Sequence, residues 1–216
     1  MNIKENSRRI LCYGDSNTWG ETPDGSFFRY PVNIRWTGLL QKKLGNNFEI
    51  IEEGLGGRTT LLDDPKEEGR NGKTYLIPCI KSQNPLDLVI LMLGTNDLKE
   101  RFNQSPEQIS KNIEELVMNI KKFSINKDGN SAKILLVSPA FMKDDCKMPE
   151  AGMRGAEVKS KQFAKEYQEV ANRQNCEFID IAQYVQPSNI DGSHFEQDGH
   201  IKVAEALEKK IKLIFK

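Results

Sequence analysis

The stretch LDLVILML, residues 86–93, constrains the fold of this chain more than any other. Every position except Asp87 is apolar, and the length suits a single strand. A strand that is apolar on both faces is typical of a parallel sheet covered by helices on both sides. This stretch therefore predicts an α/β architecture with a buried central strand.

The rest of the chain alternates short apolar runs with longer amphipathic segments. Apolar runs predict four further strands, at residues 10–13, 48–51, 134–137 and 178–181. Amphipathic spacing predicts helices at residues 36–44, 158–173 and 196–215, and one that begins after a capping Ser105. We expect an irregular chain at residues 55–74 and 139–155. The whole pattern predicts one domain, residues 1–216, built as a three-layer α/β/α sandwich around a five-stranded parallel sheet.

The charge balance argues against nucleic acid or membrane partners. Lys+Arg and Asp+Glu both total 31, so the formal net charge is zero.

The polar N-terminal segment lacks the apolar core of a signal peptide, and no apolar run approaches the ~20 residues of a membrane span. The four cysteines have neither disulfide nor zinc spacing: Cys12, Cys79, Cys146 and Cys176. We expect a cytoplasmic protein with reduced thiols.

Polar residues follow several of the predicted strands. Ligands of open α/β sheets bind outside the carboxyl ends of the strands, so these residues should share one edge. The clusters are Gly14-Asp15-Ser16, Gly56-Gly57, Thr95-Asn96-Asp97 and, beyond the fifth strand, Asp191-Gly192-Ser193-His194. Their common position favours an active site over four unrelated turns.

A serine nucleophile needs a general base, which is usually histidine. The chain has two histidines, and His200 falls on the apolar stripe of the last helix, which favours a structural role. His194 lies in a loop three residues after Asp191, whose carboxylate could orient the imidazole toward Ser16. A solvated loop histidine would be the better interpretation if the other clusters were absent.

An acyl-transfer site also needs donors for the oxyanion. The backbone N–H of Ser16 is expected at a helix N-terminus, where Ser16 could be both cap and nucleophile, and where Asp15 could brace the loop. The backbone N–H of Gly57 and the side-chain amide of Asn96 are the other candidates. A flexible turn and an Asx-turn or helix cap are their ordinary alternatives.

The segments GDSNT, GLGGRTT, GTND and DGSH resemble the four motif blocks of the SGNH, or GDSL-type, serine hydrolases, in the order of that family. The resemblance covers nearly the whole chain. RWTGLL, EEGLGGRTT and LDLVILMLGTND are similar to the small bacterial arylesterases that include acyltransferases and perhydrolases. The resemblance implies the flavodoxin-like SGNH fold, a catalytic Ser16, His194 and Asp191, and an oxyanion hole formed by Ser16, Gly57 and Asn96. Asn17 departs from the family motif, which has Leu at this position.

The expected reaction is hydrolysis of short acyl (acetyl-type) or aryl esters through an acyl-serine, without metal or organic cofactor. The residues expected at the substrate pocket are Asn17, Trp19, Thr95 and Phe195, although Trp19 could equally pack in the core. The aromatic residues Phe27, Phe28 and Tyr30 could add to its wall. No segment resembles a lipase lid, so small-molecule esters with short chains are expected. The family resemblance further implies acyl transfer to alcohols or peroxide, and a homo-oligomer that narrows the site mouth, with residues 139–155 a plausible contact.

Three other functions are compatible with these residues. One is an O-acetyl esterase acting on a carbohydrate or other natural product, as in related branches of the family. A second is a metal-dependent phosphohydrolase or metal-binding module, because Asp15, Asp97 and Asp191 at strand ends would suit Mg²⁺. A third is a binding domain without activity, which the filled triad and oxyanion positions disfavour.

Overall fold

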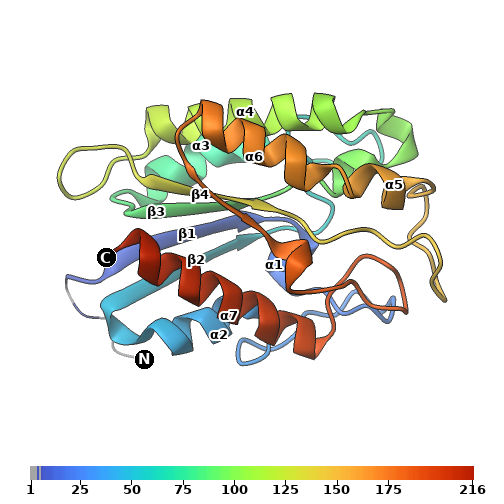
Figure 1. Ribbon diagram of the computed structural model, residues 1–216, viewed down its shortest axis with the longest axis horizontal. Helices are drawn as coiled ribbons and strands as arrows, with labels where there is room; N and C mark the ends of the chain where they lie inside the picture. Colours follow the sequence, from blue (N-terminus) through green and yellow to red (C-terminus); the bar gives the residue numbers. More distant parts are fainter. Residues whose placement is uncertain (1–3, 5) are drawn as a thin grey trace.

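Five parallel strands form one sheet in the order β2-β1-β3-β4-β5, in a computed structural model that describes residue 4 and residues 6–216 (Figure 1). The strands are β1 (Arg8–Gly14), β2 (Phe48–Gly54), β3 (Leu88–Met92), β4 (Lys133–Ser138) and β5 (Glu177–Asp180). β3 is buried along its whole length, as its sequence predicts. The expected α/β fold with a five-stranded parallel sheet is confirmed.

Two layers of helices cover the sheet (Figure 1). One layer holds α3 (Gly72–Gln83), α4 (Pro106–Phe123) and α6 (Phe163–Arg173), and the other holds α2 (Trp36–Leu44) and α7 (Gln197–Ile214). Successive strand residues serve opposite layers: Leu11 and Val89 belong to the core under α3, α4 and α6, whereas Ile10 and Ile90 belong to the core under α2 and α7. Burial on both faces explains why the strands are continuous apolar runs.

Short helices and 3₁₀ turns lie in the connections between the strands and the longer helices. They are α1 (Ser16–Trp19), α5 (Ala156–Ser160) and the 3₁₀ turns η1 (Gly45–Asn47), η2 (Asn96–Leu98), η3 (Glu100–Phe102) and η4 (Ile181–Gln183). Within the described residues, no helix has the length and apolar character needed to cross a membrane. Residues 1–3 and 5, which belong to the polar N-terminal segment considered above, lie outside the described residues.

Helix boundaries agree with the sequence at some places and differ at others. Helix α2 has the predicted bounds, and Ser105 caps α4 by accepting a hydrogen bond from Gln108 N at 3.2 Å. Helix α3 was not foreseen: the irregular chain ends at Asn71, whose side chain accepts from the N–H of Lys73 and caps the helix. The helix expected at residues 158–173 is wrong as a single element, because a turn at 161–162 separates α5 from α6.

Two glycines let the chain pack closely at the carboxyl edge of the sheet. A Cβ at Gly54, the last residue of β2, would lie 2.1 Å from the backbone nitrogen of Trp19. A Cβ at Gly14, the last residue of β1, would lie 2.1 Å from Thr18 Oγ1. Helix α1 therefore sits directly on the ends of two adjacent strands, which fixes the position of its first residue, Ser16.

Candidate active site

Ser16 is the first residue of α1, and its neighbour Asp15 is the cap. Asp15 Oδ1 accepts a hydrogen bond from Asn17 N at 3.1 Å, and its backbone oxygen accepts from the N–H groups of Thr18 and Trp19. The expectation that Ser16 itself caps the helix is wrong, because the carboxylate one residue earlier satisfies the free amide. This arrangement leaves the Ser16 hydroxyl available for other contacts, and Asp15 braces the loop as expected.

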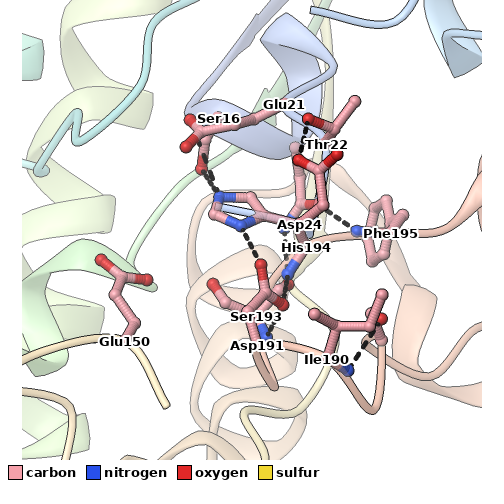
Figure 2. A network of polar contacts seen from close by, with 12 residues as sticks. Ser16, Glu21, Thr22, Asp24, Glu150, Ile190, Asp191, Ser193, His194 and Phe195 are labelled. Carbon is pink, nitrogen blue, oxygen red and sulfur yellow. Dashed lines mark hydrogen bonds and ion pairs between the residues drawn. The ribbon is translucent and has the colours of Figure 1, made fainter. Parts of the chain in front are cut away.

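Figure 2 shows Ser16, His194 and Asp191 in a continuous hydrogen-bonded chain. His194 Nε2 lies 2.8 Å from Ser16 Oγ, and His194 Nδ1 lies 2.7 Å from Asp191 Oδ2. The other oxygen of Asp191 accepts from the backbone N–H of Ser193 at 2.9 Å and of His194 at 3.0 Å. The carboxylate thus fixes both the loop and the ring, which leaves Nε2 free to take a proton from the serine.

Electrostatics support a basic imidazole at this position. Burial disfavours the imidazolium, but the hydrogen bond to Asp191 and the charges of Glu21, Asp191 and Glu150 outweigh it and raise the pKa of His194. Burial raises the pKa of Asp191, yet the hydrogen bond with His194 and that residue's charge leave it below its ordinary value. Asp191 is therefore an ionised partner that stabilises a protonated His194.

Asn17 joins the serine loop to the histidine loop. Its Nδ2 donates to the backbone oxygen of Ser193 at 3.1 Å, and its Oδ1 accepts from the backbone N–H of Phe195 at 3.0 Å. These two bonds hold the residues on either side of His194. A Leu, which the family motif has here, could make neither bond, so this departure from the motif has a structural use that the sequence did not reveal.

The other residues expected at a substrate pocket lie in different surroundings. Phe195 is 1% exposed and packs in the core against His200, so the structure places it behind the histidine loop and not on an open wall. Asn17 has its amide engaged as described above. Thr95 is buried beside Asn96, whereas Trp19 is partly exposed, with the Arg29 guanidinium 5.5 Å from its ring centre. Trp19 and Thr95 as pocket residues stay predictions.

His200 lies within the core, as its place on the helical stripe predicts. It is fully buried, its Nδ1 accepts from Trp36 N at 3.3 Å, and Tyr30 and Phe195 meet its ring edge-on. Burial lowers the pKa of His200 to about 4. The ring is therefore neutral at physiological pH and is not a competing general base.

The three groups expected to stabilise an oxyanion are the backbone N–H groups of Ser16 and Gly57 and the side-chain amide of Asn96. Asn96 begins η2, and its Nδ2 donates to the backbone oxygen of Arg58 at 3.1 Å, which orients the amide. Gly57 has φ 71°, a left-handed conformation that suits glycine. Of the described residues, none accepts a hydrogen bond from the backbone N–H of Ser16 or Gly57. Both N–H groups are available to a negatively charged oxygen.

The irregular segment 139–155 supports the Asp191 loop. Lys143 N donates to Gly192 O at 2.9 Å, and Met148 N donates to Ile190 O at 2.7 Å. A cavity of about 340 Å³ is lined by Asp191 and by residues of this segment, among them Met142, Pro149 and Glu150. Glu150 of this segment pairs with Lys99 at 3.4 Å, and its charge acts on His194 without a direct contact. Figure 2 shows Glu150 apart from the imidazole.

Glu21 is a site residue that the sequence did not single out. Its Oε2 lies 3.8 Å from His194 Nε2, and its side chain is 14% exposed. The only sequence signal is its position five residues after Ser16 in the same loop, which does not reveal the direction of the side chain.

The three aspartates considered for a metal site do not converge. Asp15 accepts from Asn17 N, Asp97 accepts from Thr60 N at 3.0 Å, and Asp191 contacts His194. No group of three or more His, Cys, Asp or Glu side chains among the described residues is arranged to hold a metal ion. The carboxylates instead organise the loops at the sheet edge.

Comparison with known proteins decides the family. The profile of the GDSL-like lipase/acylhydrolase family matches residues 12–202. The chain belongs to this family. Est24, a carbohydrate acetylesterase from Sinorhizobium meliloti, is 35% identical with a TM-score of 0.90, over 96% of this chain and 100% of Est24. The aryl esterase of M. smegmatis is 36% identical with a TM-score of 0.88, over 95% of this chain and 99% of that enzyme.

Among curated proteins, an uncharacterized lipoprotein, YqeF of Bacillus subtilis, is 31% identical over 88 residues, or 41% of this chain. The match spans 31% of YqeF, less than a third of its length. The family resemblance drawn from the sequence and the fold expected from it are confirmed. The expected enzyme class, a carboxylic ester hydrolase, agrees with the description of the family and with the esterases of similar structure.

Proposed function

We propose that this protein is a serine esterase that hydrolyses short-chain acyl or aryl esters through an acyl-serine intermediate. In this proposal Ser16 is the nucleophile, His194 is the general base and Asp191 orients the imidazole. The observation that carries it is the continuous chain of two hydrogen bonds, 2.8 Å from Ser16 Oγ to His194 Nε2 and 2.7 Å from His194 Nδ1 to Asp191 Oδ2.

Acylation begins when His194 Nε2 takes the proton of Ser16 Oγ and Oγ attacks the ester carbonyl carbon. The negative charge that develops on the carbonyl oxygen is stabilised by the backbone N–H of Ser16 and Gly57 and by the amide of Asn96. Protein dipoles that are already oriented cost no reorganisation during the reaction. The tetrahedral intermediate collapses when Nε2 protonates the leaving alcohol, which leaves the acyl group on Ser16.

Deacylation repeats the same steps with a second nucleophile. Water loses a proton to Nε2, its oxygen attacks the acyl carbon, and Oγ recovers the proton as the carboxylic acid departs. An alcohol or a peroxide in place of water would give acyl transfer by the same route. The balance between hydrolysis and transfer therefore depends on what holds the second nucleophile.

The two similar enzymes support two substrate classes, aryl esters and acetylated carbohydrates. The Glu21 carboxylate beside His194 favours the carbohydrate class as a second candidate, because carboxylates accept hydrogen bonds from hydroxyl groups. A panel of p-nitrophenyl acetate, butyrate and octanoate, with acetylated xylan and acetylated sugars beside it, separates the classes. A rate that rises with acyl length would contradict the expected short-chain preference.

We further propose a cytoplasmic homo-oligomer. The balanced charge and the four free cysteines support the location, and exposed Phe27 and Phe28, at 76% and 71%, support association of subunits. Light scattering after size-exclusion chromatography tests the assembly, and a monomer would contradict it. Recovery of the protein in the membrane fraction of its own host would contradict the location.

Labelling with a fluorophosphonate tests the nucleophile directly. We expect one covalent adduct, located by peptide mass spectrometry at Ser16, with loss of p-nitrophenyl acetate hydrolysis in proportion to labelling. The variant Ser16→Ala should take no adduct and should lose activity by several orders of magnitude. Unlabelled wild-type protein, or an Ala variant with the wild-type rate, would overturn the proposal.

A further inference from the structure

The carboxylate of Glu21 is fixed beside the reacting nitrogen of His194. The backbone N–H of Glu21 donates to Ser16 O at 3.0 Å, and an isolated bridge pairs Glu21 with Arg29. Figure 2 shows the Glu21 side chain next to the imidazole, with Oε2 3.8 Å from Nε2. The same nitrogen contacts Ser16 Oγ, so the carboxylate lies where a second nucleophile must approach.

The Glu21 carboxylate receives no hydrogen bond from any part of the chain that the structure describes. Its side chain is only 14% exposed, yet no group of the described residues donates a hydrogen bond to it. Burial raises the pKa of Glu21, while the charge of His194 opposes that change. Polar groups in such surroundings nearly always have a partner from protein, water or ligand. The side chain can therefore accept a hydrogen bond from a water molecule or substrate that enters the site.

One water molecule fits the two acceptors. Because Glu21 Oε2 and His194 Nε2 are 3.8 Å apart, a single oxygen can lie within about 2.8 Å of both. Such a water donates one hydrogen bond to each acceptor. Its lone pairs stay free to attack the acyl carbon on Ser16. A water held in this way would lie near the acyl group on Ser16, because Nε2 lies 2.8 Å from Ser16 Oγ.

We propose that Glu21 is a positioning residue that holds the hydrolytic water of deacylation and so commits the acyl-enzyme to hydrolysis. This proposal rests on the serine esterase function proposed above. In the step, the water oxygen bonds to the acyl carbon and one water proton passes to His194 Nε2. The bond between the acyl carbon and Ser16 Oγ then breaks, Oγ takes the proton from Nε2, and the carboxylic acid leaves. The second hydrogen stays on the former water oxygen and is donated in a hydrogen bond to Glu21. The Glu21 carboxylate takes up no proton and is unchanged.

The same contact disfavours an alcohol. An alcohol has one hydroxyl proton, which must pass to His194 Nε2, so its alkyl group would face Glu21 and leave the carboxylate unpaired. Leaving a charged group unpaired in a half-buried site costs more than losing a neutral contact. A site built to bind a hydrogen-bond donor rejects an analogue that lacks it. Glu21 therefore favours water over alcohols at the acyl-enzyme.

The test measures how one acyl-enzyme divides between two products. Wild-type protein and the variants Glu21→Ala, Glu21→Gln and Glu150→Gln receive p-nitrophenyl acetate at a fixed concentration of 1-propanol, and chromatography measures acetate and propyl acetate. Both products form from the same intermediate, so their ratio does not depend on the acylation rate or on the fraction of folded enzyme. A purely structural role for Glu21 would leave this ratio unchanged.

We expect Glu21→Ala to raise the ratio of propyl acetate to acetate about 10- to 100-fold. Glu21→Gln keeps an acceptor oxygen at the same place, so its ratio should stay within about threefold of wild type. Glu150→Gln is the matched control, since it also removes a negative charge that raises the pKa of His194, and its ratio should not change. An unchanged ratio in Glu21→Ala, or an equal rise in Glu150→Gln, would overturn the proposal. Wild-type protein that releases no p-nitrophenol would instead overturn the esterase function itself.

Discussion

His194 Nε2 lies 2.8 Å from Ser16 Oγ, although 178 positions separate the two residues in the chain. Asn17, the neighbour of Ser16, helps to set this distance because its side chain bonds to the backbone on both sides of His194. The serine loop and the histidine loop are thus held together by a contact next to the reacting atoms. Small changes at Asn17 should therefore affect catalysis as well as stability.

Replacement of Asn17 tests this connection. Asn17→Leu restores the residue of the family motif but removes both hydrogen bonds, and Asn17→Asp keeps only the acceptor for Phe195 N–H. Leaving the buried backbone groups unpaired should cost about 1–3 kcal/mol of unfolding free energy in the Leu variant. Urea unfolding and kcat for p-nitrophenyl acetate should rank wild type first, Asp second and Leu last. A Leu variant as stable and active as wild type would contradict the role of Asn17.

The substitution Asp191→Asn tests the orientation of His194. The amide can present an N–H to Nδ1, which favours the tautomer with the proton on Nε2 and so removes the base. We expect kcat/KM to fall by about two to four orders of magnitude with little change in the circular dichroism spectrum. Retention of more than a tenth of the activity would show that Asp191 does not orient the ring.

The oxyanion role of Asn96 predicts a different kinetic signature. Asn96→Ala removes a donor that acts mainly in the transition state, so kcat should fall about 10²- to 10³-fold while KM changes little. Fluorophosphonate labelling should still reach Ser16, only more slowly. A large rise in KM with unchanged kcat would instead indicate that Asn96 binds the substrate in its ground state.

The rate should depend on pH through His194. The free enzyme needs a neutral imidazole, so kcat/KM should rise with pH and level off above the pKa of His194, which the surroundings raise above its ordinary value. The charged groups responsible are Asp191, Glu21 and Glu150. Removing one negative charge destabilises the imidazolium, so Glu21→Gln and Glu150→Gln should move the rising limb to lower pH. A limb that does not move, or that moves to higher pH, would contradict this assignment.

The contact between Gly54 and α1 predicts a stability change. In Gly54→Ala the new Cβ would meet the backbone nitrogen of Trp19 at 2.1 Å, and backbone cannot move aside as a flexible side chain does. We expect a loss of at least about 3 kcal/mol of unfolding free energy, seen as a lower melting temperature. Gly69→Ala is a control, because its Cβ meets no atom within 4 Å and only the left-handed backbone costs about 1–2 kcal/mol. Equal destabilisation by both variants would contradict the close packing.

Much of the fold could be predicted from local patterns. The strands are apolar because they are buried on both faces, and α2 and α4 carry clear periodicity and stop or start signals. Helix α3 was missed because Pro78 lies inside it and because its polar and apolar residues do not separate into two clear faces. The break between α5 and α6 was missed because periodicity continues through a turn that only backbone geometry defines.

The amino-acid sequence alone determined which residues are candidates for catalysis. Ser16, Asn96, Asp191 and His194 follow strands of a parallel sheet, and a parallel sheet brings strand ends to one edge. Only the tertiary structure decided which way the side chains around them point. The Asn17 side chain bonds to the backbone on both sides of His194, and the Glu21 carboxylate lies beside His194 without a donor among the described residues. The direction of a side chain depends on contacts between distant loops, and no local pattern records such contacts.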